Sequence, residues 1–176
     1  MKTKILLLVG LLLILLVSDV HPAGNRSNLT GLRGVGVVVE MPGALLQKEG
    51  VGTSQLQTRV EVKLRQAGIV VLTEKERHKT PGRPYLYLSI TSVKIENVPS
   101  LAVGISLELQ ELVLLERQSK SAVGRLSEKP GFTEFAATWS TGMVGIYSTD
   151  KVRLIYDGVG DVVDRFINDY LAANAK

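Results

Sequence analysis

Residues 101–115, LAVGISLELQELVLL, alternate between apolar and small or polar side chains, and this alternation decides the fold class. A strand with one apolar and one polar face is typical of an antiparallel sheet that covers a core on one side only. Glu111 interrupts the apolar parity, which predicts a sheet margin or a bend at that position. The side chains of the apolar parity are Leu101, Val103, Ile105, Leu107, Leu109, Val113 and Leu115.

The chain before this strand has the pattern of a βαβ unit. Residues 35–39 and 69–72 are short, β-branched apolar runs, as buried strands are. Between them an apolar stripe at helical spacing predicts a helix that Thr53 or Ser54 caps and Gly68 ends. The two strands are therefore expected to be parallel neighbours joined by a right-handed crossover. The stripe consists of Leu56, Val60, Leu64 and Ala67.

Two further strands and a second helix complete the prediction. Residues 85–96 alternate, with a change of parity near Ser92 that predicts a bulge. Residues 132–145 form the last predicted strand, and from Ser148, Thr149 or Asp150 onward the apolar residues recur at helical period. The predicted fold is α+β and two-layered, in the order β-α-β-β-β-β-α. A mixed sheet of about five strands carries two helices on one face.

The N-terminus has the pattern of a secretory signal peptide. Lys2 and Lys4 precede an apolar run that ends at Val17, shorter than the about 20 residues that a bilayer-spanning helix needs. Cleavage is expected near Ala23. The alternative is an uncleaved leader, and only in that case would the chain be anchored in a membrane. The predicted organisation is a signal peptide over residues 1–23, a flexible segment over 24–32 and one domain over 33–176. The location is then periplasmic or extracellular.

Composition excludes several kinds of chemistry. The 176 residues contain no cysteine and two histidines, so disulfides, thiolate nucleophiles and histidine-based metal sites are not expected. A net charge of +4 is too small to indicate a nucleic-acid partner. No catalytic residue, metal ligand or cofactor is predicted. The sequons at Asn25 and Asn28 matter only if the source glycosylates exported proteins.

One charged loop, TEKERHKTPGRP, is the candidate binding site. Its positive charges could meet anionic lipid, lipopolysaccharide or an acidic partner, although Glu74 and Glu76 reduce the local positive charge. A loop that is simply solvated is the competing interpretation. The candidate residues are Lys75, Arg77, His78, Lys79 and Arg83.

Three other patterns have a structural interpretation. The glycines of GLRGVG precede a strand, whereas phosphate-binding loops follow one. Asp157, Asp161 and Asp164 share one helix face, where neighbouring arginines favour a solvated surface over a cation site. Trp139, the only tryptophan, shares its parity with Phe135, Ala137, Thr141 and Met143, which favours a core role in which it anchors the last helix on the sheet.

The phrases TRVEVKLRQAGIVVL, YLYLSITSVKIE and VVDRFINDYLAAN resemble exported bacterial proteins of unknown function with an FINDYLAAN-like last helix. The architecture is similar to small α/β modules of the cell envelope, such as the N-terminal domain of the Tol-system translocation protein and the curli-secretion lipoprotein. The likeness covers most of residues 33–174 and lacks the acylated cysteine of the lipoproteins. It implies a role in binding or assembly.

Two functions are therefore carried forward. The first is a non-catalytic envelope module that binds a protein, a polymer or a lipid through a sheet face or an edge strand. The alternative is a hydrolase or transferase that uses carboxylates, such as Glu108 or Glu111 with Glu134.

Overall fold

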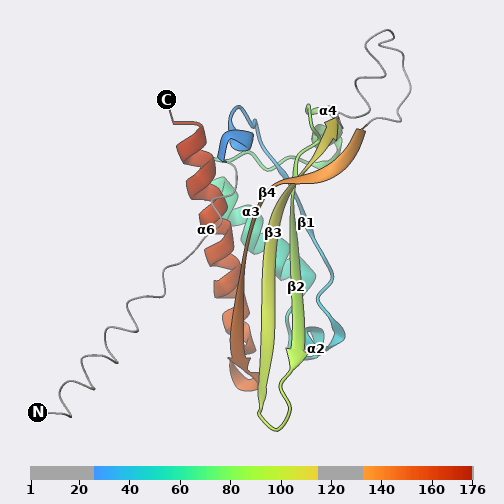
Figure 1. The fold of residues 1–176 in the computed structure, drawn as a ribbon, viewed down its shortest axis with the longest axis vertical. Coiled ribbons are helices and arrows are strands. Elements are labelled where there is room, and N and C mark those ends of the chain that lie inside the picture. The colour runs from blue at the N-terminus through green and yellow to red at the C-terminus, as the bar shows by residue number, and fades with distance from the viewer. Residues whose placement is uncertain (1–25, 115–132, 176) are drawn as a thin grey trace, which may run out of the picture.

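The computed structural model describes residues 26–114 and 133–175 (Figure 1). The predicted leader and the whole loop between the last two strands lie outside these residues. The described chain is an α+β fold with a four-stranded mixed sheet in the order β1-β2-β3-β4. The strands are β1 (Gly36–Val39), β2 (Tyr85–Lys94), β3 (Ser100–Leu114) and β4 (Thr133–Ser148).

The predicted strand at residues 69–72 is not a strand of this sheet. Only Val71 forms an isolated parallel bridge, with Val35. Leu72 N–H donates to Val35 C=O at 2.9 Å, and the chain then enters a short helix, α4 (Glu74–Lys79). The expected sheet of about five strands therefore has four within the described residues, and the parallel neighbour of β1 is β2 instead.

The core face of the sheet follows the alternation of β3. Its apolar parity from Leu101 to Leu109 is buried, and the register with β2 runs without interruption from Tyr85 opposite Gln110 to Lys94 opposite Leu101. The bulge predicted near Ser92 is therefore wrong. The apolar pattern changes parity at Val93 because this side chain lies on the solvent side of an unbroken strand, where it is 68% exposed.

The bulge of this sheet lies in β4 instead. Leu109 pairs with Trp139, whereas Gln110 pairs with Ala137, so Thr138 is the extra residue. An extra residue reverses the faces of all residues beyond it. Phe135 and Ala137 consequently lie on the face opposite Trp139, which corrects the parity read from the sequence. The predicted irregularity at Glu111 falls beside this bulge.

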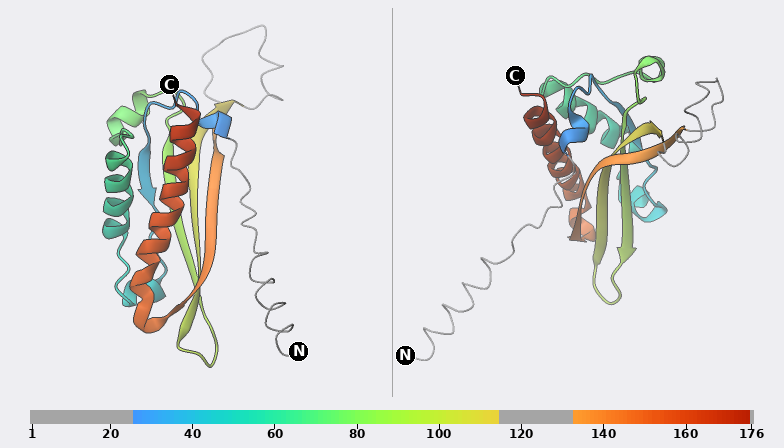
Figure 2. Two further views of the ribbon diagram at one scale, coloured as in Figure 1. Left: turned by 90° about the vertical axis from the view of Figure 1, so that its left-hand side faces the viewer. Right: turned by 45° about the horizontal axis from the view of Figure 1, so that its top comes forward.

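Two long helices cover the core face (Figure 2). They are α3 (Thr53–Gln66) and α6 (Ile155–Ala173), and they pack against each other as well as on the sheet. No side chain caps α3, whose N-cap residue is Gly52, but Gly68 ends it as expected, with φ of +76°. Gly68 N–H and Ile69 N–H donate to Arg65 C=O and Leu64 C=O, which is a Schellman ending.

Short helical segments fill the connections. The helix α2 (Ala44–Lys48) follows β1 and buries Leu46, and neither it nor α4 was predicted from the sequence. A 3-10 segment, η2 (Thr149–Leu154), joins β4 to α6, and its N-cap residue is Ser148. The order of elements therefore differs from the predicted one through these added helices and the missing strand.

Trp139 joins the sheet to α6. Its indole is 2% exposed and meets the Phe166 ring edge to face, with ring centroids 5.1 Å apart. The indole N–H donates to Asp169 Oδ2 at 3.0 Å. These contacts confirm the predicted core role, which the aromatic pair and the partly buried hydrogen bond both support.

The segment before β1 packs on the domain. Residues Arg26–Leu29 form a 3-10 turn, η1, whose Leu29 is fully buried. Asn174 closes this contact, since its amide accepts from Gly31 N–H and donates to Leu29 C=O. Residues 26–32 of the segment predicted to be flexible are therefore held against α6 by apolar burial and hydrogen bonds.

Candidate functional site

The predicted basic loop is partly helical. Thr73 and Glu76 form a capping box at the start of α4, and a hydrogen bond from Thr73 N–H lowers the pKa of the Glu76 carboxyl. Lys75, His78, Lys79 and Arg83 are exposed. These four side chains lie on the helix surface and on the turn after it.

Arg77 is separated from the other four candidates because it packs on the sheet. Its guanidinium lies 5.1 Å from the centroid of the Tyr85 ring, a cation–π contact. A Cβ on Gly36 would lie 2.9 Å from Arg77 Cδ, so a glycine at that position admits the arginine. The five predicted residues therefore do not form one cluster, and Arg77 belongs to the sheet surface.

The sheet face opposite the helices, here called the open face, carries exposed apolar side chains near the β2–β3 hairpin. Val93 pairs with Ala102, which pairs with Ile146, so these three residues form one row across three strands. Val144 lies in the next row, opposite Gly104. Val144 is 81% exposed and Ile146 is 73% exposed. We call these four residues, Val93, Ala102, Val144 and Ile146, the apolar patch.

Aromatic side chains gather at the other end of the open face. Phe135 meets Tyr85 edge to face at 5.5 Å between ring centroids, and Tyr87 lies two residues along β2 on the same face. A hydrogen bond with Glu40 raises the pKa of the Tyr87 hydroxyl. We call Tyr85, Tyr87 and Phe135 the aromatic patch. Sequence reasoning missed it because Phe135 reaches this face only through the bulge, although the shared parity of Tyr85 and Tyr87 was readable.

The carboxylates of the catalytic alternative lie on two different faces of the sheet. Glu108 is on the open face and accepts a hydrogen bond from Gln110 Nε2 at 2.7 Å. Glu111 has the opposite parity, and its carboxylate accepts from Thr138 Oγ1 at 2.6 Å. Glu134 pairs with Val113 and is exposed at the strand end. Glu134 shares the face of Glu111, because its partner Val113 has the same parity as Glu111, whereas Glu108 lies on the other face. Glu108 and Glu134 therefore cannot act on one substrate atom together.

The acidic face of α6 forms salt bridges. Asp157 Oδ1 is 2.8 Å from Arg59 Nη2, and Asp164 Oδ2 is 2.8 Å from Lys63 Nζ, which ties α6 to α3. Asp169 Oδ2 accepts the hydrogen bond from the Trp139 indole N–H, and Asp169 Oδ1 forms a salt bridge with Arg26 Nε at 2.6 Å. Among residues 26–114 and 133–175, no three acidic or histidine side chains are grouped so that they could hold a metal ion.

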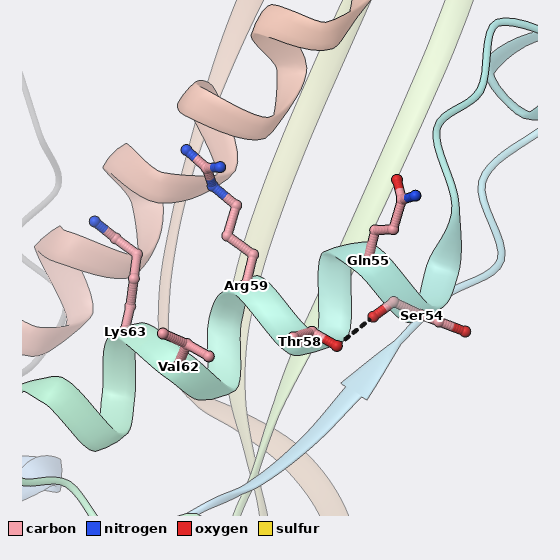
Figure 3. Close-up of a pocket in the computed structure, with 6 residues that line it drawn as sticks. All are labelled: Ser54, Gln55, Thr58, Arg59, Val62 and Lys63. Carbon is pink, nitrogen blue, oxygen red and sulfur yellow. Dashed lines mark hydrogen bonds between the residues drawn. The ribbon is translucent and has the colours of Figure 1, made fainter.

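Two surface depressions lie beside α3. Figure 3 shows one of about 600 Å³, lined by Arg59, Lys63 and their neighbours on the outer face of this helix. The Thr58 hydroxyl there donates to Ser54 C=O at 2.9 Å. The other, of about 420 Å³, lies between β1, α3 and α4 and is lined by Glu61, Arg65 and Arg77 among others. Arg59, Lys63 and Arg65 already pair with carboxylates, so neither depression offers a set of free, converging polar groups.

No family model matches the sequence, and no curated protein matches it either. Two solved structures are similar, both of the PelC dodecamer from Paraburkholderia phytofirmans. The first has a TM-score of 0.38 at 15% identity and covers 82% of this chain and 92% of that one. The second, a point variant of the same protein, has a TM-score of 0.35 at 15% identity, with coverages of 81% and 89%.

The helices in the described part of the chain are too short or too polar to cross a membrane.

Proposed function

We propose that this protein is an exported, non-catalytic binding or assembly module that acts through the open face of its sheet. The observation that carries the proposal is the apolar patch, in which Val93 of β2 and Val144 and Ile146 of β4 are each more than two-thirds exposed, with Ala102 of β3 between Val93 and Ile146. Single exposed apolar residues are ordinary on protein surfaces, whereas adjoining ones mark interaction sites.

The aromatic patch supplies the second half of the proposed surface. Tyr85 and Tyr87 present rings with polar ends, and Arg77 adds a cation over one of them. Side chains of this kind are enriched at binding hot spots because they combine large contact area with hydrogen bonding. Between the patches the open face carries small residues, Ser89, Ser106 and Gly142, over which an extended partner can lie flat.

The proposed partner is an envelope protein, a polymer or a lipid surface. The carboxylate-dependent alternative gains little from the geometry, because Glu108 and Glu134 are on opposite faces, and Glu111, which shares the face of Glu134, already accepts a hydrogen bond from Thr138.

A charge placed in the apolar patch tests the proposal. The full chain with Val93→Lys is compared with Val62→Lys, which puts the same charge on an exposed valine of α3. After expression in a host with a cell envelope, partners are cross-linked, captured and quantified by mass spectrometry. We expect Val93→Lys to lose the reproducible partners of the native chain and Val62→Lys to keep them, with equal melting temperatures. Equal partner sets in both variants, or turnover in a hydrolase screen that Glu111→Gln abolishes, would contradict the proposal.

Export is tested separately by cell fractionation and by N-terminal sequencing. We expect the protein in the periplasm or medium, beginning at Gly24. A cytoplasmic protein that still begins at Met1 would contradict this part of the proposal.

A further inference from the structure

The outer edge of β4 is a row of backbone groups that faces away from the sheet. β4 is the last strand in the sheet order, and it lies at the margin of the sheet in both views of Figure 2. The Gly142 C=O points outward, since it accepts from Arg165 Nη1 at 3.1 Å. In an antiparallel pair, residues of one parity bond the neighbouring strand and residues of the other parity point away. The even-numbered residues from Ser140 to Ser148 therefore direct their N–H and C=O groups outward.

Contacts at both ends limit this free edge. At one end Asn28 Nδ2 donates to Thr138 C=O at 2.7 Å, at the bulge. At the other, Thr149 N–H donates to Pro99 C=O at 2.9 Å and the strand ends. The free stretch is thus residues 140–148, with Val144 at its centre.

The free stretch itself lacks the residues that normally keep edge strands from pairing, and no strand of the described part of the chain covers it. Proteins blunt exposed edges with charged residues, proline or a covering segment. Residues 135–148, FAATWSTGMVGIYS, contain no charged residue and no proline. The Val144 and Ile146 side chains beside this edge are exposed. An unblunted edge of this length fits another polypeptide strand, because only a backbone presents donors and acceptors at the same spacing.

We propose that the strand which pairs with this edge is β4 of a second copy of the chain, antiparallel, with a two-fold axis through Val144. This goes beyond the proposed function, since it uses the strand edge rather than the open face. The axis makes the free stretch pair with itself, so Val144 faces its own copy and Ile146 faces Gly142 of the second copy. All these residues belong to the outward parity, so their backbone groups can bond in pairs.

Side chains beside the edge complement each other in this arrangement. Ile146 projects on the open face, where Gly142 of the second copy leaves room for it. The Gly142 carbonyl can accept a bond from the second copy while it keeps Arg165, since a carbonyl has two lone pairs. A two-fold axis brings any charged residue near it close to the same charge in the second copy. Because this strand has no charged residue, no such repulsion arises across the axis.

Charge on α6 favours the same partner. Arg165 lies beside the β4 edge, and Asp161, one helical turn earlier, is exposed and close enough to Tyr147 of β4 to contribute to the raised pKa of that hydroxyl, after burial. A two-fold axis reverses the order of these two residues in the second copy. Arg165 of each copy is thereby brought toward Asp161 of the other, which gives two symmetric attractions.

Sedimentation of the full chain purified from its expression host tests the dimer. We expect a dimer for the native chain and for Val93→Lys, whose exposed valine lies on the open face away from the edge. Val144→Lys should be monomeric, because its two ammonium groups meet at the axis. Circular dichroism should show the same fold for all three, since both substituted side chains are exposed.

Cysteine cross-linking tests the register, because the chain has no cysteine of its own. Val144→Cys should oxidise to a disulfide-linked dimer, since the two Cα atoms of an antiparallel hydrogen-bonded pair are about 5.5 Å apart, within disulfide range. Thr91→Cys, in the same row but on β2, should not, because five strand spacings put its copies about 24 Å apart.

A native chain that stays monomeric at all concentrations overturns the dimer, as do assemblies larger than two. A dimer that survives Val144→Lys overturns it as well, because the contact is then elsewhere. Failure of Val144→Cys to cross-link within an intact dimer overturns the register. A monomeric native chain leaves the open-face proposal standing, because that proposal is tested by partner capture with Val93→Lys, whose side chain lies two strands away from the edge. Val144 belongs to both surfaces and is therefore not used in that test.

Discussion

At the scale of single residues, Trp139 links the sheet to α6 by both an aromatic contact and a hydrogen bond. Its ring packs on Phe166, and its N–H bonds Asp169, which also pairs with Arg26. We predict that Trp139→Ala lowers the free energy of unfolding by about 3–5 kcal/mol, since a buried aromatic side chain leaves a large cavity. Urea denaturation measures this as a lower midpoint with an unchanged slope. Val62→Ala, on the exposed face of α3, is the control, and a loss no larger than the control's would contradict the buried role.

Two glycines of α6 form a matched pair for a second prediction. A Cβ on Gly158 would lie 2.9 Å from both Ile105 Cδ1 and Tyr147 Oη, whereas a Cβ on Gly160 would have no neighbour nearer than 3.7 Å. Gly158→Ala should therefore destabilise the fold by about 1–3 kcal/mol through overpacking. Gly160→Ala should stabilise it by up to about 1 kcal/mol through helix propensity. Thermal unfolding of both variants checks the opposite signs, and equal shifts would show that Gly158 has room.

At the scale of elements, the capping box of α4 predicts a local dependence on pH. The pKa of Glu76 is lower in the folded protein, chiefly because Thr73 N–H donates to its carboxylate. The stabilisation is therefore complete above the ordinary glutamate pKa and is lost as the pH falls through the lowered value. We expect the Thr73 and Glu76 amide signals to move together in this range in an NMR titration. Glu76→Ala should remove the transition, and its persistence in that variant would assign it to another group.

The elements that the sequence predicted well are those whose burial is periodic along one strand or helix. The alternation of β3 and the stripe of α3 report directly which side chains face the core. Residues 69–72 resemble a strand because they are buried and β-branched, yet the chain turns away after one bridge, and no local pattern encodes that. The helix α4 was readable from Thr73 and Glu76 at capping-box spacing, but its charged sequence suggested a loop.

The bulge was misplaced for a related reason. The parity of apolar residues changes near Ser92, which suggests a bulge, yet the register of β2 is unbroken there. The parity is unbroken around Thr138, yet the register of β4 shifts at that residue. Val93 is an apolar residue of the exposed open face and marks no shift of register. Phe135 lies on the face opposite Trp139 because Thr138 is an extra residue between them. Parity alone cannot separate an apolar surface from a shift of register.

At the scale of the whole molecule, the candidate site depends on contacts between strands that are distant in sequence. The apolar patch unites β2, β3 and β4, and the aromatic patch joins residues 50 positions apart, Tyr85 and Phe135. The sequence predicted that one sheet face stays uncovered by helices. Which side chains meet on that face follows from strand order and the bulge, and so could not be predicted. Of the predicted basic residues only Arg77 contacts this face.

The packed turn η1 has a consequence for the order of events during export. If the leader is cut after Ala23, as the sequence predicts, only Gly24 and Asn25 separate the cut from Arg26, which is tied to Asp169. A peptidase needs several residues of extended chain around its target bond, and from Arg26 onward the folded domain holds the chain in a 3-10 turn with Leu29 buried. We expect processing to precede folding. Purified precursor should be cleaved faster when Trp139→Ala destabilises the domain than when it is native, and equal cleavage rates would show that the folded domain leaves the site accessible.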